Sequence, residues 1–228
     1  MEGVNVPKQW RAVDYFVSTF QLGVQMKAGN LNFMAYVIAT AIFLGKTAYG
    51  VEVGGVKMDD SVTLEKQNLQ LNGAGVRYKA IFKVYAAALY LREKKSTAGD
   101  AIAEPGAKRV TLVMLRDVSS EELSNGFLNA MRQNLDAGEK ANVMGSMYRL
   151  GALFSGTPEL PKGTVLNIDL SADAALNVSL NGKKFGEPIK DPALCNALLK
   201  IWLGEKPVDA GLKQAMLGIQ PVELARNY

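Results

Sequence analysis

The residues with the clearest chemical potential lie in the stretch Leu71–Leu91, LNGAGVRYKAIFKVYAAALYL. Arg77 follows two glycines, Gly73 and Gly75, and precedes a run of strand-forming residues that contains Tyr85. Glycine permits unusual backbone angles or lets another group come close. The run predicts a strand that is half or fully buried. Arg77 therefore lies either at a strand edge in water or beside a partner inside the protein.

The composition narrows the chemistry that Arg77 and its neighbours could carry out. The chain has 228 residues and no histidine, which excludes Ser-His-Asp and Cys-His catalysis and every metal site that needs imidazole. Cys195 is the only cysteine, so the chain forms neither an internal disulfide nor a CxxC site. We predict no metal and no other cofactor. Any chemistry has to come from Arg, Lys, Tyr, Asp, Glu, Ser or Thr.

The charge balance bears on possible partners. The 26 basic and 22 acidic side chains give a formal net charge of +4. The sequence shows no basic stripe interleaved with aromatic residues, so we predict no nucleic-acid partner. Hydrophobic residues make up 48% of the chain, which is ample for one globular domain with a real core.

An apolar run near the N-terminus predicts an export signal. Residues 33–44, FMAYVIATAIFL, would span roughly 18 Å as a helix, well short of the roughly 30 Å of bilayer hydrocarbon. Met26 and Lys27 precede the run, and Ala48 and Gly50 fit the −3 and −1 positions of a cleavage site. The alternatives are a buried first helix or a membrane tether.

These features predict two regions of the chain. Residues 1–50 form an N-terminal extension and signal peptide, with the true start at Met1 or Met26, and residues 51–228 form the mature domain. We expect a secreted or periplasmic protein with no stable transmembrane segment after processing.

The mature chain reads as strands, then helices, then strands and helices again. Short strands are expected at 51–56, with a Gly54-Gly55 turn or bulge, and at 62–64 and 69–71. Two further strands are expected on either side of a bend between Arg77 and Phe82. Later strands are expected at 109–115, 164–170 and 174–180, and the last of these ends in an Asn181-Gly182 hairpin turn. With little βαβ alternation, this order predicts an α+β fold: a mostly antiparallel sheet with helices on one face.

Capping signals predict the helices. A helical turn is expected at 98–103. The first long helix is expected to be capped by Ser119, with the Glu122 side chain reaching back to the Ser119 backbone N–H, and to end at Gly138. Three more helices are expected at 143–154, from Asp191-Pro192 to Gly204, and at 209–217.

At Leu71–Leu91 the chain resembles the chalcone isomerase-like family. The glycine-alanine-glycine turn, the arginine two residues on and the strand VYAAALYL carry the resemblance. It continues through RVTLVMLRDVSSEEL (109–123), NGKKFGEPI (181–189) and ALCNALLKIWLGEKPVDAGLK (193–213), and it is nearest to bacterial exported members. The resemblance implies an open-faced β-sandwich, in which a layer of helices covers a large antiparallel sheet and a ligand cleft lies between them.

The family contains isomerases and fatty-acid binders, and both have an arginine where this chain has Arg77. In the isomerases it stabilises an enolate oxygen; in the binders it meets a fatty carboxylate. The resemblance further implies that Tyr85 marks a binder, because the isomerases have threonine there. The isomerases also place a tyrosine, a lysine and an asparagine at the start of the helix matched here by Ser120–Asn125, and this chain has no tyrosine or lysine there. They have a polar pair where this chain has Leu194 and Cys195.

The resemblance therefore implies a non-catalytic binder of a fatty acid or similar apolar carboxylate, held by Arg77 and Tyr85. The alternative is an intramolecular lyase of chalcone isomerase type acting on an enone, with Arg77 as its catalytic residue. A third interpretation is an envelope protein with a vestigial cleft, whose surface binds another protein.

The same side chains have plainer structural interpretations. Arg77 could be a surface arginine, and Tyr85 and Trp202 core aromatics. Cys195 is expected to be a buried small residue. Two further expectations are a loop ion pair between Arg116 and Asp117 and helix N-terminal charges at Glu121 and Glu122.

Overall fold

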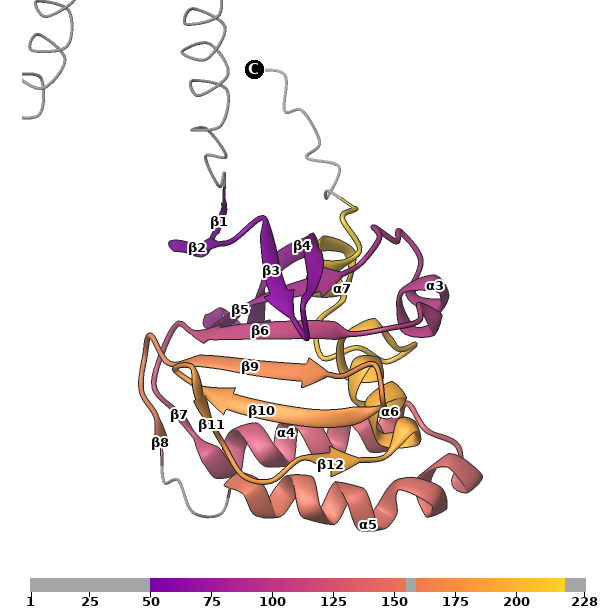
Figure 1. The fold of residues 1–228 in the computed structure, drawn as a ribbon. Helices are drawn as coiled ribbons and strands as arrows, with labels where there is room; N and C mark the ends of the chain where they lie inside the picture. The colour runs from indigo at the N-terminus through magenta and orange to yellow at the C-terminus, as the bar shows by residue number, and fades with distance from the viewer. Residues whose placement is uncertain (1–49, 155–158, 220–228) are drawn as a thin grey trace, which may run out of the picture. The chain divides into compact units, whose positions relative to one another are not determined.

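The fold is described from a computed structural model, which covers residues 50–154 and 159–219 (Figure 1). The predicted signal peptide, apart from Gly50, lies outside the described residues. In chain order the elements are β1 (Val51–Val53), β2 (Val56–Met58), β3 (Ser61–Leu64), β4 (Gln67–Lys79), β5 (Phe82–Leu91), α3 (Ala98–Ala103), β6 (Lys108–Met114), β7 (Val118–Ser119), α4 (Ser120–Gln133), α5 (Ala137–Phe154), β8 (Glu159–Leu160), β9 (Val165–Leu170), β10 (Ala175–Leu180), β11 (Lys183–Lys184), β12 (Ile189–Lys190), α6 (Pro192–Leu203) and α7 (Ala210–Met216).

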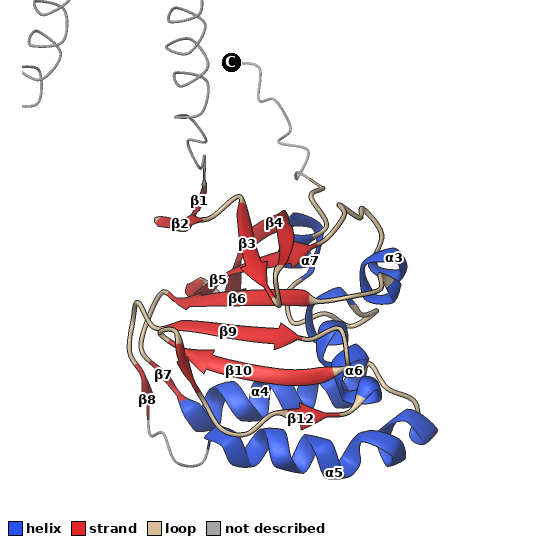
Figure 2. Cartoon of the chain, viewed as in Figure 1, coloured by secondary structure: helices blue, strands red, loops and turns tan. Residues whose placement is uncertain are grey.

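One large antiparallel sheet organises the described part of the chain. Its strands follow the order β11-β10-β9-β6-β5-β4-β3, and β12 pairs with β10. Every pairing within this sheet is antiparallel. In Figure 2 the strands form a broad layer with α4, α5 and α6 against it. The predicted α+β fold is therefore confirmed.

Strand β5 is the centre of the core because both of its faces are buried. Tyr85 and the alternate residues Ala87, Leu89 and Leu91 pack into the larger apolar cluster, which includes α4, α5, α6 and α7. Ala86, Ala88 and Tyr90 point to the other face, into a smaller cluster with residues of β1–β4. Within the described residues, no helix is long and apolar enough to cross a membrane.

Helix α7 lies directly on the two glycines that precede Arg77. Gly73 and Gly75 face the same side of the sheet because they alternate along β4. A Cβ added at Gly73 would lie 2.0 Å from the carbonyl oxygen of Ala215, and one at Gly75 would lie 2.6 Å from the Ala215 Cβ. Of the two roles predicted for these glycines, close approach of another segment is the one the structure uses.

A β-bulge at Asn72 ties β4 to its surroundings. Leu71 pairs with Tyr90 and Gly73 with Leu89, so Asn72 is an extra residue on β4. Its amide donates to the carbonyl oxygens of Met216 at 2.7 Å and of Lys95 at 2.9 Å. The bulge thereby anchors the end of α7 and the β5–β6 connection to one residue of the sheet.

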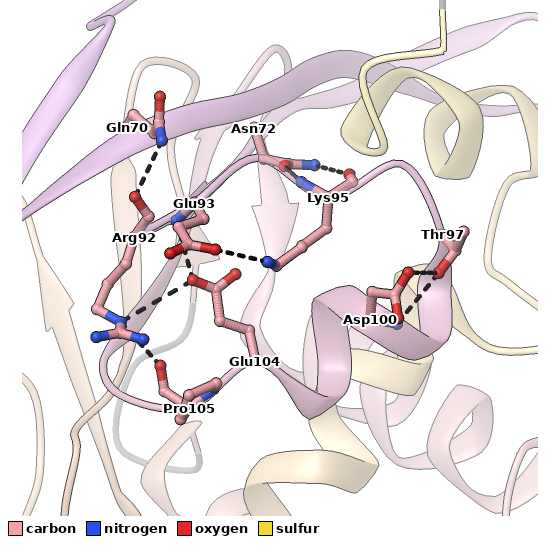
Figure 3. Close-up of polar contacts among 9 residues, drawn as sticks. All are labelled: Gln70, Asn72, Arg92, Glu93, Lys95, Thr97, Asp100, Glu104 and Pro105. Carbon is pink, nitrogen blue, oxygen red and sulfur yellow. Dashed lines mark hydrogen bonds and ion pairs between the residues drawn. The ribbon is translucent and has the colours of Figure 1, made fainter.

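The β5–β6 connection is held by a polar network (Figure 3). Arg92 donates from Nε to the Pro105 carbonyl oxygen at 3.0 Å, and Glu104 Oε1 accepts from the backbone N–H of Glu93 at 2.9 Å. Thr97 caps α3 by accepting from the backbone N–H of Asp100 at 3.2 Å. This network fixes the predicted polar loop and confirms its predicted helical turn.

The structure corrects several local predictions. Residues 51–56 hold parts of two strands, joined by the Gly54-Gly55 turn, rather than a single strand. The separate strand predicted at 69–71 is part of the thirteen-residue β4. Gly138 does not end a helix: α4 ends at Gln133, and Gly138 lies in the first turn of α5.

The reciprocal capping box lies at α5 rather than at α4. Ser119 does cap α4, since its Oγ accepts from the Glu122 N–H at 3.0 Å, but the Glu122 carboxylate turns away to Arg116. At α5, Asp136 Oδ1 accepts from the Glu139 N–H at 2.8 Å, and Glu139 Oε2 accepts from the Asp136 N–H at 3.1 Å. This second box explains why a helix starts where glycine was expected to end one.

Candidate functional site

Arg77 and Tyr85 lie opposite each other on neighbouring strands, on the face of the sheet that the helices cover. They are directly paired in the β4–β5 ladder. The guanidinium carbon of Arg77 lies 5.3 Å from the centre of the Tyr85 ring, which is within the range of a cation–π contact. The structure therefore brings the two predicted site residues together.

A second β-bulge gives this pair its setting. Arg77 pairs with Tyr85 and Tyr78 with Lys83, so Val84 is an extra residue on β5. Val84 and Tyr85 are consequently both buried in the larger cluster, although neighbours on a regular strand face opposite sides. The bulge separates the buried part of β5 from the exposed residues Phe82 and Lys83.

Tyr85 is fully buried and hydrogen-bonded to a helix above the sheet. Its hydroxyl oxygen accepts from Nε1 of Trp202, on α6, at 3.0 Å. Burial raises the pKa of the Tyr85 phenol, while the charge of Arg77 and the hydrogen bonds that Trp202 and Arg77 make with the phenol oppose that shift. The phenol is therefore neutral at physiological pH and keeps a proton that it can donate.

Arg77 carries an unmet hydrogen-bonding capacity. Its side chain is half-buried, and its Nε is buried with no hydrogen-bond partner among the described residues. Within the same part of the chain, no carboxylate forms an ion pair with it. A buried donor without an acceptor is costly in a folded protein, so this guanidinium is a candidate anchor for an anionic ligand.

Asp209 borders the site, but its carboxylate is already engaged. Oδ1 caps α7 by accepting from the Leu212 N–H at 3.0 Å, and Oδ2 accepts from the Tyr78 N–H at 2.9 Å. The first turn of α7 thus lies next to Arg77, while its last turn covers Gly73. Along one face of β4, alternate positions hold Gly73, Gly75 and Arg77. Helix α7 covers the two glycines, and Arg77 lies beyond the N-terminal end of the helix.

Other candidate side chains have structural partners. Arg116 and Lys79 both contact Glu122 Oε1, at 2.9 Å and 3.1 Å, and these contacts lower the pKa of Glu122. The expected Arg116–Asp117 ion pair is wrong, because Arg116 donates to the backbone carbonyl oxygen of Asp117 instead. Cys195 is buried as predicted, and burial raises the pKa of its thiol to about 11.

Sequence reasoning treated Trp202 only as a core residue and gave Asp209 no role at the site. Trp202 is indeed fully buried, and its ring also makes an edge contact with Phe127 at 5.5 Å. A buried indole N–H needs an acceptor, so the sequence did contain a signal for a polar partner. Nothing local to either residue identified Tyr85 or Tyr78 as that partner, because they lie more than a hundred residues away.

A groove on the molecule lies away from this pair. It has a volume of about 720 Å³ and runs between α4 and α5, with Leu128, Met144 and Tyr148 among its lining residues and Arg132 and Lys140 on its walls. Neither Arg77 nor Tyr85 lines it. Among the described residues there is also no cluster of three or more acidic or cysteine side chains that could hold a metal ion.

Comparison with known proteins agrees with the observed fold. The model of the chalcone isomerase-like family matches residues 50–218. The fold is similar to the crystal structure of the Arabidopsis thaliana fatty-acid-binding protein AtFAP1, with a TM-score of 0.55 and 18% sequence identity over 69% of this chain and 95% of that one. A search of curated proteins found no match. Because the family model matches most of its length, the chain belongs to the chalcone isomerase-like family.

Proposed function

We propose that this protein binds a fatty acid or a similar apolar carboxylate without transforming it, and that Arg77 and Tyr85 hold the carboxylate. The observation that carries the proposal is the buried Arg77 Nε, which lacks a partner among the described residues and lies beside the Tyr85 ring. The structural similarity to a plant fatty-acid-binding protein supports the same class of ligand.

The two side chains offer complementary hydrogen bonds to a carboxylate. A guanidinium presents a planar fork of donors and can bind both oxygens at once. Tyr85 adds an O–H donor, because its raised pKa keeps it protonated and Trp202 already donates to its oxygen. All of these groups donate, which suits an anionic head group rather than a neutral one.

The acyl chain would lie between the sheet and the helices. In the structure this space is filled by side chains, including Phe127, Leu198 and Trp202. Binding therefore requires neighbouring segments to separate. The short α7 is the element whose displacement would open this space beside Arg77, since it packs on β4 and β5 there.

The proposal predicts charge-selective binding. The delipidated protein is expected to bind palmitate with a micromolar or lower Kd. Palmitic acid methyl ester should bind at least about 10-fold more weakly, because it lacks the charged oxygens that strengthen the hydrogen bonds. Calorimetric titration measures both. Absence of palmitate binding at micromolar concentration, or equal affinity for acid and ester, would refute the proposal.

We propose also that the protein is exported and that residues 1–50 are removed. The apolar run 33–44 and the small residues at 48 and 50 support this. Expression in a bacterium with an intact secretion system should yield a periplasmic or secreted protein whose first residue is Val51. N-terminal sequencing that finds the leader retained on a cytoplasmic product would contradict it.

A further inference from the structure

The turn between β4 and β5 exposes a cluster of large apolar side chains. Ile81 is 83% exposed and Phe82 is 65% exposed, and Tyr78, close by in the sequence, is also exposed. The same strand becomes fully buried from Val84 onwards. Tyr78 pairs with Lys83 and Lys79 pairs with Phe82, so Tyr78 faces the opposite side of the hairpin from Phe82. The adjacent Ile81 and Phe82 are therefore the exposed apolar pair that offers one contact surface. We refer to residues 78–83 as the hairpin tip.

The hairpin tip extends beyond the strands on either side of it. Pairing between β5 and β6 begins at Tyr85, and pairing between β3 and β4 involves only residues 67–70 of β4. Residues 78–83 are therefore a two-stranded extension without a neighbouring strand. The bulge at Val84 marks the point where this extension leaves the main sheet.

The apolar residues at this turn are not required by its backbone. Ala80 has a φ of 54°, in the left-handed region that favours glycine, asparagine or aspartate. Two other tight turns of the described chain use Gly54-Gly55 and Asn181-Gly182, and a third uses the charged pair Glu65-Lys66. Ala174, in the turn between β9 and β10, also has a positive φ, so among the turns of the described residues the feature that sets the hairpin tip apart is the exposed Ile81. Its composition thus points to a binding role.

Basic side chains surround the tip. Lys79 and Arg116 share the single carboxylate of Glu122, and both line a small hollow with Ala80 and Phe82. Lys83 is exposed and has no ion pair among the described residues. The carboxylates of Glu122 and of Asp209, whose Oδ2 accepts from the Tyr78 N–H at 2.9 Å, lie against these three cations, so the surface keeps a small excess of positive charge.

We propose that the hairpin tip docks on a membrane surface that contains anionic lipids. Ile81 and Phe82 enter the boundary between head groups and acyl chains, and Lys79, Lys83 and Arg116 remain at the level of the lipid phosphates. Aromatic residues and arginine are enriched in protein interfaces, but lysine is depleted there. The two lysines, Lys79 and Lys83, are therefore what favours a membrane over a protein partner. Arg77 and Tyr85 lie on the same hairpin, so docking brings them close to the head groups. The docking itself does not depend on the proposed ligand.

Vesicle binding of the full chain tests this inference. The wild type is expected to co-sediment with vesicles containing phosphatidylglycerol more strongly than with pure phosphatidylcholine, and added salt should weaken the binding. The double variant Ile81→Ser, Phe82→Ser should lower the partition coefficient by about 10-fold or more. The matched control Tyr148→Ser removes an equally exposed aromatic side chain from α5 and should leave binding unchanged.

A second measurement reports on the tip alone, whatever residues 1–49 contribute to vesicle binding. The variants Ile81→Cys and Tyr148→Cys are labelled with a polarity-sensitive dye, which the buried Cys195 does not take up. Emission from position 81 should shift to the blue on anionic vesicles, and emission from position 148 should not. Docking is contradicted if position 81 stays in water on anionic vesicles, or if the double serine variant partitions like the wild type.

Discussion

Replacement of Arg77 with methionine is expected to lower the affinity for palmitate by about 10- to 100-fold, while the ligand-free protein stays as stable as the wild type. The expected loss of affinity corresponds to charge-assisted hydrogen bonds worth about 1.5–3 kcal/mol. Methionine keeps much of the apolar stem of arginine, so packing beside Tyr85 is retained. Calorimetric titration measures the affinity, and thermal unfolding measures the stability.

The stability of this variant distinguishes a binding role from a structural one. Removing Arg77 sacrifices a cation–π contact worth about 0.5–1 kcal/mol, but it also removes a buried donor that lacks a partner among the described residues. The two effects oppose each other. A structural arginine would behave differently, since its loss would reduce the melting temperature clearly and ligand affinity only indirectly.

Arg132→Met is the matched control. Arg132 lies in the groove between α4 and α5, so the substitution makes the same chemical change away from Arg77. The variant should bind palmitate as the wild type does. If Arg132→Met weakened binding and Arg77→Met did not, the ligand would belong to the groove and our assignment of the site would be wrong.

Replacement of Gly73 with alanine is expected to destabilise the fold by about 3 kcal/mol. The added Cβ would lie 2.0 Å from the Ala215 carbonyl oxygen and within 2.9 Å of backbone atoms of Gly218 and Met216. Because all three obstacles are backbone atoms, no side-chain rotation relieves the overlap. The end of α7 has to move, which also strains the Asn72 hydrogen bond to Met216.

Denaturant unfolding checks this prediction against a second glycine. Gly145 lies in the middle of α5, where an added Cβ meets nothing within 4 Å. Gly145→Ala should therefore stabilise the protein by about 0.5–1 kcal/mol, because alanine is the better helix former. If Gly73→Ala unfolded at the same denaturant concentration as the wild type, close packing of α7 on β4 would be excluded.

The sequence was informative wherever the signal is local. The Asn181-Gly182 turn, the Asp191 cap followed by Pro192, and the helical turn at 98–103 lie where they were predicted. Each depends on the backbone preferences of a few adjacent residues. The long apolar strand predicted at 109–115 likewise appears as β6, in the middle of the sheet.

Local reasoning failed where tertiary contacts decide. Glu122 has the correct spacing for a capping box, but the fold places Lys79 and Arg116 within reach of its carboxylate, and those ion pairs prevail. The box at Asp136 and Glu139 was visible in the sequence, but Gly138 between them was interpreted as a helix end. Glycine in a first helical turn is tolerated when the cap before it is strong.

The candidate site was predictable only in part. Arg77 and Tyr85 were identified through the family resemblance, and their direct pairing follows from the hairpin between them. The Trp202 hydrogen bond to Tyr85 and the position of Asp209 beside Tyr78 were not predictable, because each joins the sheet to a helix far along the chain. Such contacts depend on how α6 and α7 pack, which no short segment encodes.

The central claim is that Arg77 and Tyr85 hold the carboxylate of an apolar acid. A crystal structure of the delipidated protein with a fatty acid brominated at its tail end tests it most directly, since anomalous scattering locates the bromine. We predict a carboxylate within about 3 Å of the Arg77 guanidinium, with the bromine between the sheet and the helices. A bromine in the groove between α4 and α5, with the carboxylate at Arg132 or Lys140, would contradict the claim.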